Sequence, residues 1–101
     1  ISFTGNTTIA GSDGGKHYYS TQSSSFTLTV ANSATVGFTV GTAINVINQG
    51  TGTITIAPAG GVTMYLAGNA TPSSRTLASF GMATIQKVAT DTWFLVGVGL
   101  A

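Results

Sequence analysis

Charged side chains are scarce in this chain of 101 residues, where they make up 5% of the sequence against roughly 25% in an ordinary globular domain. Three Lys and Arg residues are set against two Asp and Glu residues, so the formal net charge is +1. A protein that binds nucleic acid needs several cations on one face to neutralise phosphates. The composition therefore excludes a nucleic-acid surface, and hydration has to come from Ser, Thr, Asn and Gln side chains.

The sequence also lacks cysteine, which excludes both a disulfide framework and a thiolate site. Its mean hydropathy is positive, at +0.38, yet no apolar run approaches the ~18 residues that a membrane-spanning helix needs. The longest run, Phe94–Ala101, is interrupted by Gly97 and Gly99, so we expect no membrane partner. The chain opens on Ile1 without a signal-peptide pattern, and we expect it to be a fragment or a processed product.

Apolar residues alternate with small or polar ones in several short segments, which is the pattern of half-buried strands. No window of 11 or more residues has helical periodicity, and no fixed-period repeat is evident. We therefore predict an all-β fold, a small antiparallel sandwich or barrel of about ten short strands, which is oligomeric. We expect one domain, with a β domain over residues 16–101 and an N-terminal strand or arm and Gly-rich loop over residues 1–15.

The clearest alternation lies in Val36–Gly61, where three short strands are predicted with two sharp reversals between them. Residues Gln49–Gly52 form the predicted turn between the second and third strands, and we expect a positive φ angle there. A separate hairpin is predicted at the C-terminus, joining Met82–Ala89 to Thr92–Val98 through a turn at Thr90 and Asp91.

Few residues are candidates for catalysis or metal binding. The GSDGGKH segment departs from a phosphate-binding loop, because Ala10 replaces the first Gly and His17 replaces the Ser or Thr after Lys. Asp13 and Asp91 are the only carboxylate side chains, which is too few for a strong calcium site, and a glycosidase would need both. His17 has no neighbouring His or Cys to share a metal. We therefore predict no enzymatic activity, no cofactor and no metal.

Ligand contacts, if present, are expected at aromatic side chains that can stack on sugars. The candidates are Tyr18 and Tyr19 in one predicted strand, Tyr65 in another, and Asn69 in the polar loop Ala67–Ser74. Aromatic residues in strands belong more often to a core or an interface, and both interpretations remain open at this point.

The WFLVGV segment near the C-terminus is apolar on both faces of its predicted strand. Trp93 and Leu95 alternate with Phe94, Val96 and Val98. A strand of this kind must be covered on both sides. The central strand of a sandwich would meet this requirement, but we favour a subunit interface that covers one face, so the sequence predicts an oligomer in which these five residues belong to the interface or the core. We expect the Trp93 ring in the core.

The order of segments in this chain resembles a β domain that recurs in tailed-bacteriophage virion proteins. The resemblance spans about residues 15–99 and is most specific in the N-Q-G-x-G-x-x-T-I run at Asn48–Ile56 and the K-V-x-x-D-x-W run at Lys87–Trp93. Proteins with this domain include tail-fibre and tailspike segments, head fibres and capsid decoration proteins. They look like trimeric structural modules without a catalytic motif.

The resemblance implies a non-enzymatic virion structural protein on the particle exterior, namely a homotrimeric capsid decoration (cement) domain or a head- or tail-fibre domain that contacts other virion proteins. The alternative is a receptor-binding adhesin module, which binds host glycan through the tyrosines or the polar loop. A depolymerase is disfavoured by the presence of only two carboxylates. Exposed aromatic side chains around a groove would favour the adhesin, and apolar side chains sealed between subunits would favour the structural module.

Overall fold

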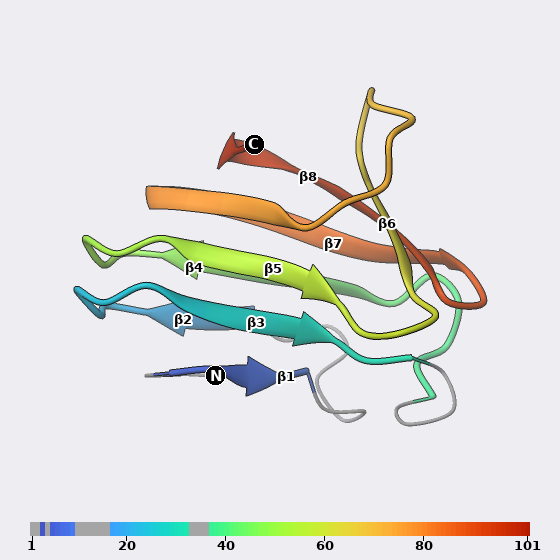
Figure 1. Ribbon diagram of the computed structural model, residues 1–101, viewed down its shortest axis with the longest axis horizontal. Coiled ribbons are helices and arrows are strands. Elements are labelled where there is room, and N and C mark those ends of the chain that lie inside the picture. The colour runs from blue at the N-terminus through green and yellow to red at the C-terminus, as the bar shows by residue number, and fades with distance from the viewer. Residues whose placement is uncertain (1–2, 4, 10–16, 33–36) are drawn as a thin grey trace.

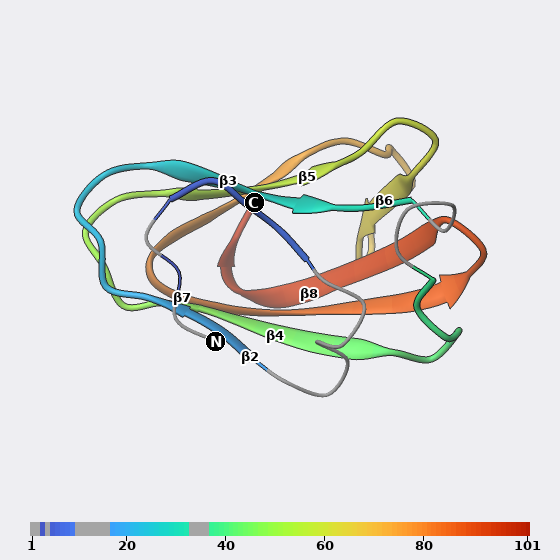
Figure 2. The same ribbon diagram turned by 90° about the horizontal axis from the view of Figure 1, so that it is seen from below.

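The computed structural model describes residues 3, 5–9, 17–32 and 37–101. Every regular element among these residues is a β-strand, and all eight strands belong to one sheet that curls over on itself as an open half-barrel (Figure 1 and Figure 2). The predicted all-β class is confirmed. The strands are β1 (Thr7–Thr8), β2 (His17–Ser20), β3 (Phe26–Val30), β4 (Ala43–Asn48), β5 (Ile54–Pro58), β6 (Thr63–Leu66), β7 (Arg75–Ala89) and β8 (Thr92–Leu100).

The sheet is mixed rather than antiparallel. Its strands run in the order β1-β3-β5-β7-β4-β2, with β8 on the other edge of β7 and β6 beyond β8. Among the described strands, β1–β3, β3–β5, β2–β4 and β6–β8 pair in parallel, and the three pairings that involve β7 are antiparallel. The predicted antiparallel arrangement is therefore wrong, and the described residues form eight strands where about ten were predicted for the chain.

Strand β7 connects the two halves of the curled sheet. Near its start Leu77 pairs with Ile54 of β5, and further along Ile85 pairs with Ile44 of β4. Between these pairings the strand bends at Phe80, which has a φ of 60°. The predicted strand Met82–Ala89 is the second part of this single bent strand of 15 residues. The predicted β7–β8 turn is confirmed, with Asp91 at a φ of 53°.

Two parts of the chain form the same structure 28 residues apart. His17 of β2 pairs with Asn45 of β4, and Phe26 of β3 pairs with Ile54 of β5, so both strand pairs keep one constant offset. We call residues 17–30 the first arch and residues 45–58 the second arch. The offset is a feature of the strand pairing, and the sequence itself shows no fixed-period repeat. The aligned arches share only one identical residue, Thr27 with its equivalent Thr55, so the offset cannot be read from the sequence.

The turn of the second arch corrects the predicted hairpin. Strands β4 and β5 do not pair with each other, and Gly50 and Gly52 have no positive φ. A Cβ atom on Gly50 would overlap the carbonyl oxygen of Gln22, and one on Gly52 would overlap that of Ser24. These glycines are needed because the two turns stack backbone against backbone. The first of the three strands predicted within Val36–Gly61, at residues 36–40, is also absent. The described residues 37–40 form no strand.

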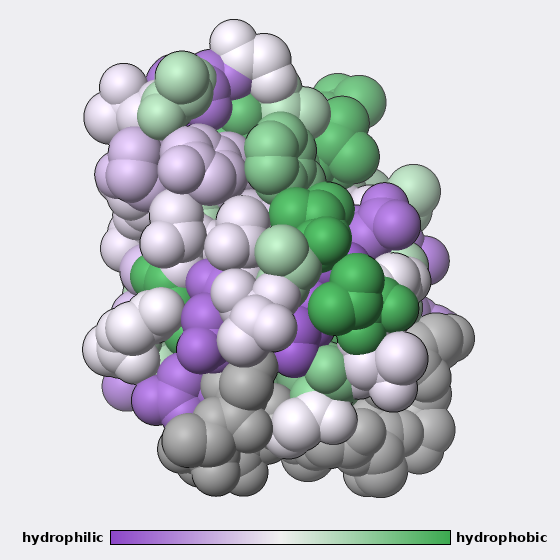
Figure 3. All heavy atoms as spheres, turned by 90° about the vertical axis from the view of Figure 1, so that its right-hand side faces the viewer, coloured by the Kyte–Doolittle hydropathy of each residue, from purple (hydrophilic) through white to green (hydrophobic). Residues whose placement is uncertain are grey.

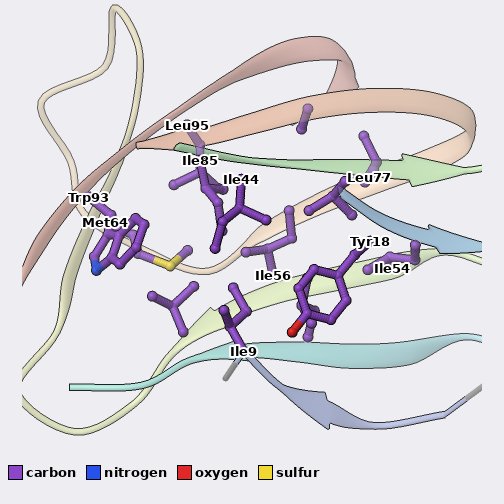
Figure 4. Close-up of a cluster of buried hydrophobic side chains, with 14 of the residues drawn as sticks. Ile9, Tyr18, Ile44, Ile54, Ile56, Met64, Leu77, Ile85, Trp93 and Leu95 are labelled. Carbon is purple, nitrogen blue, oxygen red and sulfur yellow. The ribbon is translucent and has the colours of Figure 1, made fainter. Parts of the chain in front are cut away.

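The core lies between the two halves of the sheet and is filled by alternate residues of nearly every strand (Figure 4). Trp93 and Met64 lie toward one end of this core, and Tyr18 lies toward the other. The Trp93 ring meets Phe38 edge-on at a centroid distance of 5.4 Å. The fully buried side chains of the core include Ile9, Leu28, Val30, Ile44, Val46, Ile56, Leu77, Ile85 and Leu95.

The N-terminal residues that the structure describes join this same core. Strand β1 pairs in parallel with β3, and Ile9 is fully buried. Asn6 Oδ1 accepts a hydrogen bond from the Thr27 amide at 2.8 Å. The predicted Gly-rich loop, with Asp13 and the preceding Ala10, lies outside the described residues.

Candidate functional site

The two faces of β8 have opposite environments. Trp93 and Leu95 point inward and are 1% and 0% exposed, whereas Phe94, Val96 and Val98 point outward and are 41%, 57% and 84% exposed. The period-2 alternation of a strand places these two sets on opposite sides. The chain therefore covers one of the two apolar faces that the sequence predicts and leaves the other in contact with solvent.

The exposed side chains of β8 continue onto β7. Met82, which is 56% exposed, lies directly opposite Val98 in the antiparallel pair, and side chains of paired residues share one face. We call Met82, Phe94, Val96 and Val98 the outer apolar face. Figure 3 looks at the end of the molecule where β7 turns into β8, and the hydrophobic side chains visible at this end gather mainly on the right-hand side. Phe80, at the bend of β7, adds a side chain that is 76% exposed.

An apolar row extends this face across four strands. Val98 of β8 is opposite Met82 of β7, Met82 is opposite Ile47 of β4, and Ile47 is opposite Tyr19 of β2. Ile47 and Tyr19 are half-buried. In the neighbouring row the Thr84 hydroxyl donates a 2.6 Å hydrogen bond to Asn45 Oδ1. The sheet surface is thus apolar along the row that contains Met82. In the next row, two polar side chains are hydrogen-bonded to each other.

Both basic residues in the described part of β7 are withdrawn from the surface. Lys87 is 4% exposed and its Nζ donates a 2.6 Å hydrogen bond to the Phe38 carbonyl. Arg75 is 8% exposed and its guanidinium donates a 2.6 Å hydrogen bond to the Thr71 carbonyl. Buried cations need such polar partners. No other Lys or Arg falls within the described residues, so the part of the exterior that the structure describes presents none of these cations.

The predicted ligand-contact residues do not form one site. Tyr18 is 2% exposed, with its ring edge-on to Phe3 at 5.5 Å, so the expectation that it contacts a ligand is wrong. Tyr19 lies on β2, and Tyr65 lies on β6 and packs on Phe94 at a centroid distance of 5.3 Å. Strands β4, β7 and β8 separate the two tyrosines along the sheet.

Asn69, the fourth predicted contact, is exposed in the loop after β6, where its Oδ1 accepts a 2.9 Å hydrogen bond from the Thr71 amide. His17 begins β2 and is exposed, while Asp91 lies in the β7–β8 turn. Within the described ranges, no three His, Cys, Asp or Glu side chains gather as a metal site would require.

Met82 is the member of the outer apolar face that sequence reasoning missed. The signal was present, because the turn at Thr90 and Asp91 sets the register that places Met82 opposite Val98. If residues are paired one by one from the turn along both strands, Met82 meets Val98 only when the irregular register between Lys87 and Ala89 is included. That irregularity cannot be read from the alternation of apolar residues.

The chain matches no protein-family model, and comparisons with curated proteins and with solved structures found no match either. None of the described residues forms a helix long and apolar enough to cross a bilayer. The function must therefore be inferred from the outer apolar face and the chemistry around it.

Proposed function

We propose that this chain is a non-enzymatic structural domain of a bacteriophage virion, which forms a homotrimer on the particle exterior as a capsid decoration or as part of a head or tail fibre. The observation that supports it most is the outer apolar face, whose members Val96 and Val98 are 57% and 84% exposed. Contiguous exposed apolar surface of this kind marks a site of association. The sequence resemblance to phage virion domains supplies the trimeric state and the particle.

The size of the surface suits a contact between protein subunits. The four side chains of the outer apolar face are between 41% and 84% exposed, and contiguous apolar patches of about 300–600 Å² are often functional. A stable interface buries about 800 Å² on each partner. The contact must therefore also take in neighbouring groups such as Ile47, Tyr19 and Tyr65, which are half-buried and border the face.

The distribution of charge favours a second copy of the chain as the partner. Identical copies carry identical charges, so a highly charged exterior opposes self-association. Here Arg75 and Lys87 are both buried, and a net charge near zero promotes association. The outer apolar face itself carries no charged residue, so it offers nothing to a partner of opposite charge.

A host-glycan adhesin is the second candidate, and one observation favours it. Tyr65 and Phe94 form an aromatic pair on β6 and β8, and Phe94 is 41% exposed. Aromatic rings with an apolar body are suited to stacking on sugar rings. The adhesin uses this pair as a ligand platform, whereas the structural module buries Phe94 between subunits.

Light scattering at micromolar concentration tests the proposal. The wild-type chain should give about three times its mass of 10.1 kDa, because large permanent interfaces persist on dilution. The double change Val96→Lys and Val98→Lys should give a folded monomer. Val40→Lys is the matched control, because Val40 is 55% exposed but lies outside the face, and this variant should remain a trimer.

A wild-type chain that is monomeric at these concentrations would overturn the structural proposal. Loss of glycan binding in Phe94→Ala, with a monomeric wild type, would make the adhesin the better description. The location on the particle is tested separately by mass spectrometry of purified virions, in which the copy number of the chain should be divisible by three.

A further inference from the structure

We propose that the open edge of β8, Val96–Gly99, pairs with an edge strand of a second copy, so that backbone hydrogen bonds join the protomers alongside the outer apolar face. This assignment rests on the proposed self-association and specifies how the contact is made. A three-fold arrangement requires the edge to meet a different edge of the next copy, because only a two-fold axis lets a strand pair with itself.

The partner strand of β8 ends before β8 does. Strand β6 pairs with β8 from Thr92 to Leu95, and the last hydrogen bond on that side runs from the Ala67 amide to the Leu95 carbonyl at 2.7 Å. After Ala67 the chain leaves the sheet for the polar loop. Among the residues that the structure describes, none pairs with Val96–Gly99 on this side, and all four are exposed.

The direction of the backbone groups follows from that last hydrogen bond. Along an antiparallel pair, successive residues alternate between bonding to their partner and pointing away from it. The Leu95 carbonyl points away from β7, toward β6, so Gly97 two residues later presents its N–H and C=O to the same side. At Gly97 these groups face solvent, beyond the end of β6. Gly97 has no side chain because a Cβ atom there would overlap the Met82 carbonyl oxygen of β7, while its backbone groups on the other side stay open.

Over Val96–Val98 this edge lacks charge and Pro and keeps a regular register with β7, and the register becomes irregular only beyond Val98, where Gly99 has a φ of 81°. Natural edge strands are protected by charged residues, by Pro or by bulges that twist them away. None of the residues from Val96 to Gly99 is charged or is Pro, and the exposed Val96 and Val98 flank Gly97. The edge is also continuous with the outer apolar face, since Val96 and Val98 belong to both. A single partner can therefore bury the side chains and satisfy the backbone together.

Amide hydrogen exchange at Gly97, measured by NMR, tests the assignment. In the wild-type oligomer the Gly97 amide should exchange roughly 100-fold or more slowly than that of Gly60, since exchange of a hydrogen-bonded amide requires opening of the structure. Gly60 is the internal reference because it is exposed in an open turn. In Met82→Lys, which disrupts the face without altering the edge, the protein should be monomeric and Gly97 should exchange rapidly.

Two results would overturn the edge pairing while leaving the self-association intact. One is an oligomer in which Gly97 exchanges as fast as Gly60, because the copies then meet through side chains alone. The other is a Gly97 amide that stays protected in monomeric Met82→Lys, because the chain itself then satisfies it. A wild-type chain that is monomeric at NMR concentrations would overturn both the edge pairing and the proposed function.

Discussion

The stacked arches differ from the antiparallel pair of β7 and β8, which we call the β7–β8 ribbon, in whether their groups find partners within the chain. Each arch closes on itself: Ser20 Oγ accepts the Gln22 amide at 3.3 Å, and at the equivalent place 28 residues later Asn48 Oδ1 accepts the Gly50 amide at 3.1 Å. The ribbon buries its inner face, which includes Trp93, in the core, and its outer face is exposed to solvent. The arches thus supply their own partners, whereas the ribbon is complete only when another surface covers it.

This difference separates residues that hold the fold from residues that serve association. Substitutions in the arch turns and on the inner face of the ribbon should change the free energy of unfolding of the chain. Substitutions on the outer face should change the oligomeric state and leave the fold of the protomer in place. Pairs of similar residues on opposite sides of this division provide the tests.

The largest effect is expected for Trp93→Ala. Removing a buried aromatic side chain costs about 3–5 kcal/mol, because lost burial is compounded by the cavity left behind, and the Phe38 ring would lose its edge-on partner. A domain with a total stability of roughly 5–15 kcal/mol should then melt at a much lower temperature. Thermal melts followed by circular dichroism measure the change.

Phe94→Ala is the control for this comparison, since Phe94 is the next residue along the strand and faces outward. Its protomer should unfold with a free energy within about 1 kcal/mol of the wild type when both are compared as monomers, in the Val96→Lys and Val98→Lys background, as is usual for surface substitutions. If Trp93→Ala leaves the melting temperature unchanged, the inner face of the ribbon does not hold the fold.

The double change Gly50→Ala and Gly52→Ala should have the next largest effect. Both new methyl groups would overlap backbone carbonyls of the first arch, which cannot rotate away as a side chain can. Overpacking of this kind costs about 1–3 kcal/mol at each site. Urea denaturation measures the loss, and Gly60→Ala is the control because a Cβ there meets nothing within 4 Å. Equal midpoints for both variants would show that the turns do not stack this closely.

A smaller effect is expected for Asn48→Ala, which removes a side-chain link between the turn of the second arch and β7. Asn48 Nδ2 donates to the carbonyls of Gly52 and Leu77 at 2.8 and 3.1 Å, and the residue is 1% exposed. Leaving buried polar groups without partners costs about 1–3 kcal/mol. Asn45→Ala should cost less, because Asn45 is exposed. If the two variants have equal denaturation midpoints, the buried amide contributes no more than its exposed counterpart.

The sequence predicted strands well where one face is buried, but apart from the β7–β8 hairpin it predicted neither their direction nor their partners. Alternation at Leu28 and Val30 marks an inward face whether the neighbouring strand is parallel or antiparallel. The QGTG turn is equally compatible with a hairpin and with an arch, and only the close contact of Gly50 with the preceding turn distinguishes them. Adjacent Tyr18 and Tyr19 point to opposite sides, and the sequence does not say which one is buried.

The candidate surface was predictable in part for the same reason. The two-sided apolar pattern of β8 predicted that one face would need a cover, and the exposed Val98 fits that expectation as far as a single chain can. The contribution of Met82 and the open backbone at Gly97 depend on register and on where β6 ends. Those are properties of the assembled sheet and not of any one segment.

The constant offset between the arches makes this half of the molecule a stack with translational symmetry. A third unit of 28 residues placed after the second would meet the same backbone pattern that the second meets on the first, and would lengthen the stack by the ~4.8 Å spacing of neighbouring strands. The glycines at positions 50 and 52 are the local requirement for each added layer, since every new turn must lie flat on the one beneath it. Elongation would continue until an antiparallel strand such as β7 terminates the parallel edges.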